Sequence, residues 1–134
     1  MSDKKKTTRR LNRIEQSDLD LEIAFMEGIV KRDPRIVEAW FALSQDYARR
    51  GKLECRIKAT EELAKLCPND PHVLYDLACC YSLVRDTERG IPTLMRAIGR
   101  GFNDVKWLLK DPDLRNIRKD GGFREVWKKL SEVR

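Results

Sequence analysis

Hydrophobic residues recur along this chain at the spacing of amphipathic helices, and polar segments with proline or glycine separate the stretches. The first stretch follows Ser17 and Asp18, which can cap a helix. Its apolar positions are Leu19, Leu21, Ile23, Met26, Ile29 and Val30. The next stretch places Trp40, Leu43 and Tyr47 at i, i+3 and i+7. No segment shows the strict alternation of a half-buried strand, so the pattern predicts an all-α fold.

Proline and glycine mark where these helices should end. Asp33 precedes Pro34, which stops the first helix and can open the next one, because a proline N–H is not needed there. Gly51 can take the left-handed conformation that closes the second helix. The remaining boundaries are expected at Cys67–Pro68, Asp70–Pro71, Asp86–Thr87 and Gly99–Gly101.

Several apolar positions recur after thirty-four residues. Tyr47 recurs as Tyr81 and Leu43 as Leu77, and isoleucine occupies positions 23, 57 and 91. This period is typical of a helix–turn–helix solenoid unit. Such a unit buries its apolar face by stacking on its neighbours and leaves an extended surface free. The pattern therefore favours a binding scaffold over a catalytic pocket.

From Phe102 onward the pattern changes. A short helix is expected from Asp104 to Lys110, a break at Asp111 and Pro112, and a turn over residues 119–122. The last amphipathic helix carries Phe123, Val126, Trp127 and Leu130. A solenoid exposes the apolar face of its end helix, so a segment of different sequence suits a cap. Three large aromatic side chains are expected to be buried there: Trp107, Phe123 and Trp127.

These residues resemble the tetratricopeptide repeat. The pattern appears twice, as Trp40-x2-Leu43-Ser44-x2-Tyr47 and as Leu74-x2-Leu77-Ala78-x2-Tyr81. The segment from Gly101 to Phe123 is similar to the end-of-group segment that closes many bacterial arrays of this family. Arg56 and Thr60 stand where the family usually has small residues, and Arg85 stands where the preceding copy has Gly51.

The resemblance implies a short solenoid of about seven to eight helices with a helical cap. The expected division is a basic, disordered leader at residues 1–16, repeats at residues 17–101 and an end-of-group cap at residues 102–134. Within the array, a half repeat covers residues 17–36, and two repeats cover residues 37–70 and about 71–104. The family binds proteins or peptides in a groove lined by the first helix of each repeat, so the resemblance implies a non-catalytic adaptor.

The helical spacing predicts which residues would line that groove. On the second helix the face opposite Trp40 carries Glu38, Phe41, Gln45 and Arg49. One repeat later the equivalent face carries His72, Tyr75, Cys79 and Ser82. Phe41 and Tyr75 would then form an exposed aromatic pair that anchors a peptide. The alternative is that the leader or the cap folds back and buries both rings.

The charge distribution supports a rival interpretation. The formal net charge is +6, and residues 1–14 carry six basic side chains against one acidic one. This basic arm consists of Lys4, Lys5, Lys6, Arg9, Arg10 and Arg13. It could bind nucleic acid or an anionic surface together with Arg115, Arg118, Lys119, Arg124, Lys128 and Lys129. The simpler interpretation is a solvated leader, and no RNA-binding or helix-turn-helix signature accompanies the charges.

The remaining chemistry is sparse. The four cysteines form no CxxC motif, and His72 is the only histidine, so no metal site or cofactor is expected. Asp111 and Asp113 are interpreted as helix caps. No apolar run is long enough to span a membrane. The sequence therefore predicts a cytoplasmic, bacterial adaptor for a protein or peptide partner, with nucleic acid as the weaker alternative and self-association left open.

Overall fold

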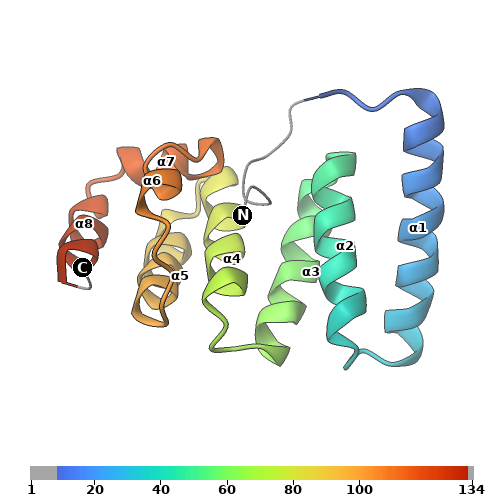
Figure 1. Cartoon of the computed structure of the whole chain (residues 1–134), viewed down its shortest axis with the longest axis horizontal. Helices are drawn as coiled ribbons and strands as arrows, with labels where there is room; N and C mark the ends of the chain where they lie inside the picture. The colour runs from blue at the N-terminus through green and yellow to red at the C-terminus, as the bar shows by residue number, and fades with distance from the viewer. Residues whose placement is uncertain (1–8, 133–134) are drawn as a thin grey trace. The chain divides into compact units, whose positions relative to one another are not determined.

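The computed structural model describes residues 9–132, and all regular structure in that range is helical. This confirms the predicted all-α fold. The elements, shown in Figure 1, are α1 (Arg13–Arg32), α2 (Val37–Arg50), α3 (Leu53–Leu66), α4 (Pro71–Leu83), α5 (Thr87–Gly99), α6 (Val105–Leu108), η2 (Pro112–Leu114), α7 (Arg115–Lys119) and α8 (Phe123–Glu132). None of these helices combines the length and apolar character that a bilayer-spanning helix needs.

The chain divides into two compact units between residues 66 and 67. The N-terminal unit contains α1, α2 and α3, and the C-terminal unit contains α4 to α8. Helices α4 and α5 thus share one unit with the tail that follows them. The predicted division into leader, repeats and cap at residues 16 and 101 stays a prediction.

The core of the N-terminal unit forms where α2 packs against both α1 and α3. Its buried side chains come from all three helices: Leu19, Ile23, Val30, Ala39, Leu43, Tyr47 and Ala59. Leu21, which the sequence pattern grouped with Leu19 and Ile23, is 69% exposed instead. Two residues along a helix differ by about 200° in direction, so Leu21 and its neighbours cannot all face the same side.

Helix α1 begins earlier than expected. Asn12 is its N-cap, because the Asn12 side chain accepts from Glu15 N at 2.8 Å and Glu15 Oε1 accepts from Asn12 N at 3.0 Å. This reciprocal pair forms a capping box. The cap is therefore Asn12 rather than Ser17 or Asp18, and residues 13–16 of the expected leader are helical. Pro34 lies in a turn before α2 and does not open that helix.

The C-terminal unit is built on the pair α4 and α5. Its tail returns across this pair: η2 and α7 pack against α4, and α8 packs against α5 (Figure 1). The buried side chains from the tail are Phe102, Leu108, Leu114, Ile117, Val126 and Leu130. Trp107 and Phe123 are partly buried against this core, whereas Trp127 is 51% exposed, contrary to expectation.

Helices α2 and α4 end in the same way, thirty-four residues apart. Gly51 follows α2 with φ 78°, and Arg85 follows α4 with φ 63°. In both turns a later backbone N–H reaches back to a tyrosine carbonyl at 2.9 Å, from Lys52 to Tyr47 and from Asp86 to Tyr81. The predicted left-handed turn at Gly51 is confirmed, and Arg85 adopts the same region without the freedom of glycine.

Candidate functional site

In the described part of the chain, the predicted groove is exposed along one face of α2. Glu38, Phe41, Gln45 and Arg49 are all exposed. Phe41, the only aromatic residue in this set, is 51% exposed. The opposite face of α2 carries the buried Ala39, Leu43 and Tyr47. An aromatic ring held at a polar surface by a well-packed helix is a suitable anchor for a protein ligand.

The equivalent face of α4 has a different environment. His72 is exposed, but Tyr75, Cys79 and Ser82 are completely buried. Phe102, which follows α5, stacks on Tyr75 with ring centroids 4.0 Å apart and an interplanar angle of 10°. The rings of His72 and Phe102 lie nearly perpendicular, with centroids 6.0 Å apart and an interplanar angle of 78°. The prediction that Phe41 and Tyr75 form an exposed pair is therefore wrong, because Tyr75 is buried.

Asp111 holds the tail against the buried face of α4. Its Oδ2 accepts hydrogen bonds from the Tyr75 hydroxyl at 2.7 Å and from the Cys79 thiol at 3.7 Å. Burial, together with the nearby Cys79 and Asp111, raises the pKa of the Tyr75 hydroxyl, which remains a neutral donor. Arg118 fixes the same segment by donating to the carbonyls of Leu108 and Asp111 at 2.9 and 2.8 Å.

The tail also provides hydrogen-bond partners for Ser82, which lies near the C-terminal end of the same α4 face. Ile117 N donates to Ser82 Oγ at 3.2 Å, and Asn116 Nδ2 donates to the Ser82 carbonyl at 2.8 Å. The C-terminal segment thus occupies the α4 face from Tyr75 to Ser82. Helical spacing correctly placed these residues on one face of α4, but it contained no signal for which part of the chain would cover that face.

Cys79, Asp111 and Asp113 bring potential metal-ligand atoms within 4.8 Å of one another. Both carboxylate oxygens of Asp111 already accept hydrogen bonds, because Asp113 N donates to Oδ1 at 2.9 Å. This bond makes Asp111 the N-cap of η2, as the sequence predicted. The contacts explain the cluster as a structural junction between α4 and the tail.

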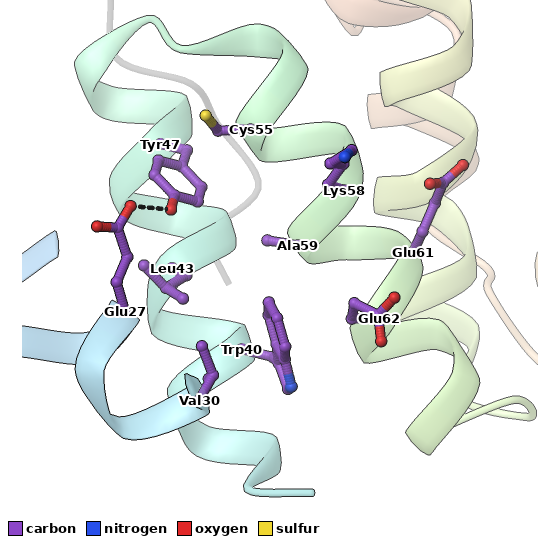
Figure 2. A pocket seen from close by; sticks show the side chains of 10 residues that line it. All are labelled: Glu27, Val30, Trp40, Leu43, Tyr47, Cys55, Lys58, Ala59, Glu61 and Glu62. Atoms are coloured by element: carbon purple, nitrogen blue, oxygen red, sulfur yellow. Dashed lines mark hydrogen bonds between the residues drawn. The ribbon is translucent and has the colours of Figure 1, made fainter. Parts of the chain in front are cut away.

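Sequence reasoning missed a groove of about 410 Å³ in the N-terminal unit. Figure 2 shows it between side chains of α1 and α3, with residues of α2 between them. Its apolar wall includes Val30, Leu43 and Ala59, and Trp40 lies at one end. The charged residues around it are Glu27, Lys58, Glu61 and Glu62. The repeat spacing marked Leu43 and Tyr47 as core residues, so it gave no sign of a hollow beside them.

Two hydrogen bonds fix the aromatic residues of this groove. The Tyr47 hydroxyl donates to a carboxylate oxygen of Glu27, the bond drawn in Figure 2. Burial and then Glu27 raise the pKa of Tyr47, so this hydroxyl also stays protonated. Trp40 Nε1 donates to the Pro34 carbonyl at 2.8 Å. The first bond connects α2 to α1, and the second connects α2 to the turn that precedes it.

The basic residues of the rival interpretation are only partly described. Lys4, Lys5 and Lys6 lie outside the described residues. Arg9 makes a bidentate pair with Glu15 at 3.0 Å, next to the capping box. Arg118 is committed to the backbone carbonyls of the tail. These contacts give both arginines a structural role, and binding of nucleic acid by the basic residues stays a prediction.

Comparison with known proteins supports a helical repeat. No protein-family model matches the chain. The chain is 32% identical over 89 residues to a chloroplastic protein of Arabidopsis thaliana, covering 64% of this chain and 27% of that protein. It is 33% identical over 72 residues to the PEX5-related proteins of Mus musculus and Homo sapiens, covering 54% of this chain and 13% and 12% of theirs.

This chain therefore spans about a quarter or less of the length of these relatives. The matches and the all-helical fold fit a tetratricopeptide-like repeat. The bacterial source and the cytoplasmic location stay predictions from the sequence.

Proposed function

We propose that this chain is an adaptor without catalytic activity that binds a protein segment on the exposed face of α2. The observation that carries this proposal is Phe41, half exposed in the middle of a face that also presents Glu38, Gln45 and Arg49. Within residues 9–132 these four predicted groove residues are all exposed, whereas on α4 only His72 of the predicted groove is exposed. Protein-binding surfaces commonly use such an aromatic anchor surrounded by polar groups.

The C-terminal unit suggests what a ligand of this face would resemble. Helices α2 and α4 stand thirty-four residues apart in the repeat, so Phe41 corresponds to Tyr75 and Gln45 to Cys79. The tail covers the α4 residues with a stacked aromatic ring and with hydrogen-bond acceptors on Asp111. By analogy, the ligand of α2 contributes an apolar or aromatic side chain over Phe41 and a hydrogen-bonding group beside Gln45. Glu38 and Arg49 would then select for complementary charge at the two ends.

Peptides selected from a random display library on the full chain would provide the probe for this proposal. Their affinity would be measured by isothermal titration calorimetry for the parent, for Phe41→Ala and for Trp127→Ala. Loss of an aromatic anchor costs about 2 kcal/mol or more, so Phe41→Ala should weaken binding by roughly 30-fold. Trp127 is exposed to the same extent, 51%, and is the matched control. Its replacement should change affinity by less than about twofold.

Equal binding by the parent and Phe41→Ala would reject the α2 face as the site. If charge reversal of Arg124, Lys128 and Lys129 abolished binding in that case, the basic-surface alternative would replace the proposal. Circular dichroism and thermal melting of each variant would show that the changes in binding are not caused by unfolding.

A further inference from the structure

Helix α1 has two apolar faces, and only one of them is buried. Leu19, Ile23 and Val30 pack into the core of the N-terminal unit. On the opposite side, Ile14, Leu21 and Phe25 are 73%, 69% and 66% exposed. At about 100° per residue these three side chains point within roughly 40° of one another and form one stripe. They are the three most exposed large hydrophobic residues described in the chain.

The stripe marks the open end of the N-terminal unit. Helix α2 packs on one side of α1, and among the described residues of this unit no helix packs on the other side (Figure 1). The stripe runs from Ile14 to Phe25, about 17 Å along a 20-residue helix. An apolar face of this length on a solvent-facing helix is typical of a surface that associates with another protein.

The residues beside the stripe would let the stripe of one copy pair with the same stripe of a second copy. Gly28 and Arg32 continue the same line toward the C-terminal end of α1, and Asp18 lies next to it near the other end. A Cβ atom placed on Gly28 would meet no atom within 4 Å, so a second backbone can approach closely there. No ion pair involves Asp18 or Arg32 within residues 9–132.

An antiparallel copy of the helix uses all of these features together. When Leu21 of one copy packs against Phe25 of the other, the two-fold axis passes level with Ile23. Asp18 then lies level with Gly28 of the second copy, one helical turn from its Arg32. Helical side chains lean toward the N-terminus, so that arginine reaches back toward the aspartate. Two-fold symmetry forms this pair twice.

We propose that the exposed stripe of α1 is a homodimer interface, in which two copies of this chain pair α1 antiparallel through Leu21 and Phe25 at the centre, with Ile14 of each copy level with Arg32 of the other. The interface involves a different helix from the ligand-binding face proposed on α2 and does not depend on it. One helix pair buries a small area, so the dimer belongs to the weak class and dissociates at micromolar concentrations.

Sedimentation velocity of the full chain over a range of concentrations tests this interface. The parent should show a concentration-dependent monomer–dimer equilibrium. Leu21→Glu places a charge at the centre of the interface and should raise the dimer Kd by about 30-fold or more. Trp127→Glu, the same kind of change at an exposed aromatic residue of another helix, should leave the Kd unchanged. Because Leu21 is mostly exposed, the folded monomer should survive, as checked by circular dichroism.

A charge exchange tests the register. Asp18→Arg should weaken the dimer by about 3- to 10-fold, and the double variant Asp18→Arg/Arg32→Asp should restore the parent Kd to within about twofold. The two positions are about 21 Å apart along one helix, so they cannot restore each other within a single copy. Recovery would therefore require contact between two copies.

A parent chain that stays monomeric at about 1 mM would overturn the proposal, as would a dimer that Leu21→Glu leaves intact. A dimer sensitive to Leu21→Glu but not restored by the double exchange would overturn the antiparallel register. Peptide binding at Phe41 provides an independent measurement, because Leu21→Glu should retain it. The two proposals can therefore fail separately.

Discussion

At the scale of single residues, the carboxyl group of Asp46 is the least typical member of the N-terminal core. Only 5% of Asp46 is exposed, and its Oδ2 has no hydrogen-bond partner among the described residues. Burial, followed by the nearby carboxylate of Glu22 on α1, raises the pKa of Asp46 to about 7, while Arg49 opposes the shift. The group is thus protonated in the folded chain over a range in which it is ionised in the unfolded chain.

This difference predicts how stability depends on pH. Between about pH 4 and pH 7 the folded state binds more protons at Asp46 than the unfolded state, so this residue makes stability fall as pH rises through that window. Well above pH 7, Asp46 is ionised in both states, and its destabilising effect no longer changes with pH. Asp46→Asn removes the ionisation and should stabilise the chain by roughly 2–4 kcal/mol at pH 8, with little effect near pH 4. Urea unfolding of both proteins from pH 4 to pH 8 would measure the difference. If the free energy of unfolding depended on pH in the same way for both proteins, the raised pKa of Asp46 would be contradicted.

At the scale of elements, the helices end by local rules that repeat from α2 to α4. The same backbone hydrogen bonds close both helices, with Gly51 in one turn and Arg85 in the other. A left-handed backbone brings the Cβ of a non-glycine residue close to the following carbonyl, at a cost of about 1–2 kcal/mol. The repeat therefore keeps the geometry of its turn even where glycine is missing.

Arg85→Gly should stabilise the chain, because it relieves this contact. Part of the gain is offset by the greater entropy of glycine in the unfolded chain, which leaves a net stabilisation of about 0.5–1 kcal/mol. Gly51→Ala is the control with the opposite sign and should destabilise by about 1 kcal/mol. Thermal melting of both variants provides the measurement. A lower melting temperature for Arg85→Gly would show that the arginine side chain has a stabilising role that outweighs its backbone conformation.

At the scale of the whole molecule, each of the two compact units has its own core. The N-terminal core gathers α1, α2 and α3, and the C-terminal core joins α4 and α5 to the tail. The tail is integral to the second core, because Phe102 is fully buried and stacks on Tyr75. Damage to this contact should therefore affect the C-terminal unit first.

Phe102→Ala should destabilise the C-terminal unit by about 3–5 kcal/mol, since it removes a buried ring and leaves a cavity against Tyr75. Hydrogen exchange followed by mass spectrometry should show lost protection in α4, α5 and the tail, and smaller changes in α1 to α3. Trp127→Ala should cost only about 1 kcal/mol, because half of that ring is exposed. Equal loss of protection in both units would indicate that they unfold as a single cooperative body.

The sequence by itself determined the features that depend on neighbours along the chain. The helical fold, the turn at Gly51 and the cap at Asp111 follow from spacing and from local backbone chemistry, and the structure confirms them. Spacing also placed Tyr75, Cys79 and Ser82 on one side of α4. These signals are readable because a helix fixes the direction of each side chain relative to the next.

Only the tertiary structure decided which of those faces stay open. Phe41 and Tyr75 occupy equivalent positions in the repeat, yet Phe41 is half exposed and Tyr75 lies beneath Phe102. Leu19 and Leu21 are equally apolar and lie on opposite faces of α1, yet Leu19 is 5% exposed and Leu21 69%, because only the Leu19 face packs into the N-terminal core. Periodicity specifies the face a residue occupies, whereas burial depends on what the rest of the chain packs against that face. That outcome is set by contacts between residues far apart in the sequence, such as Tyr75 and Asp111.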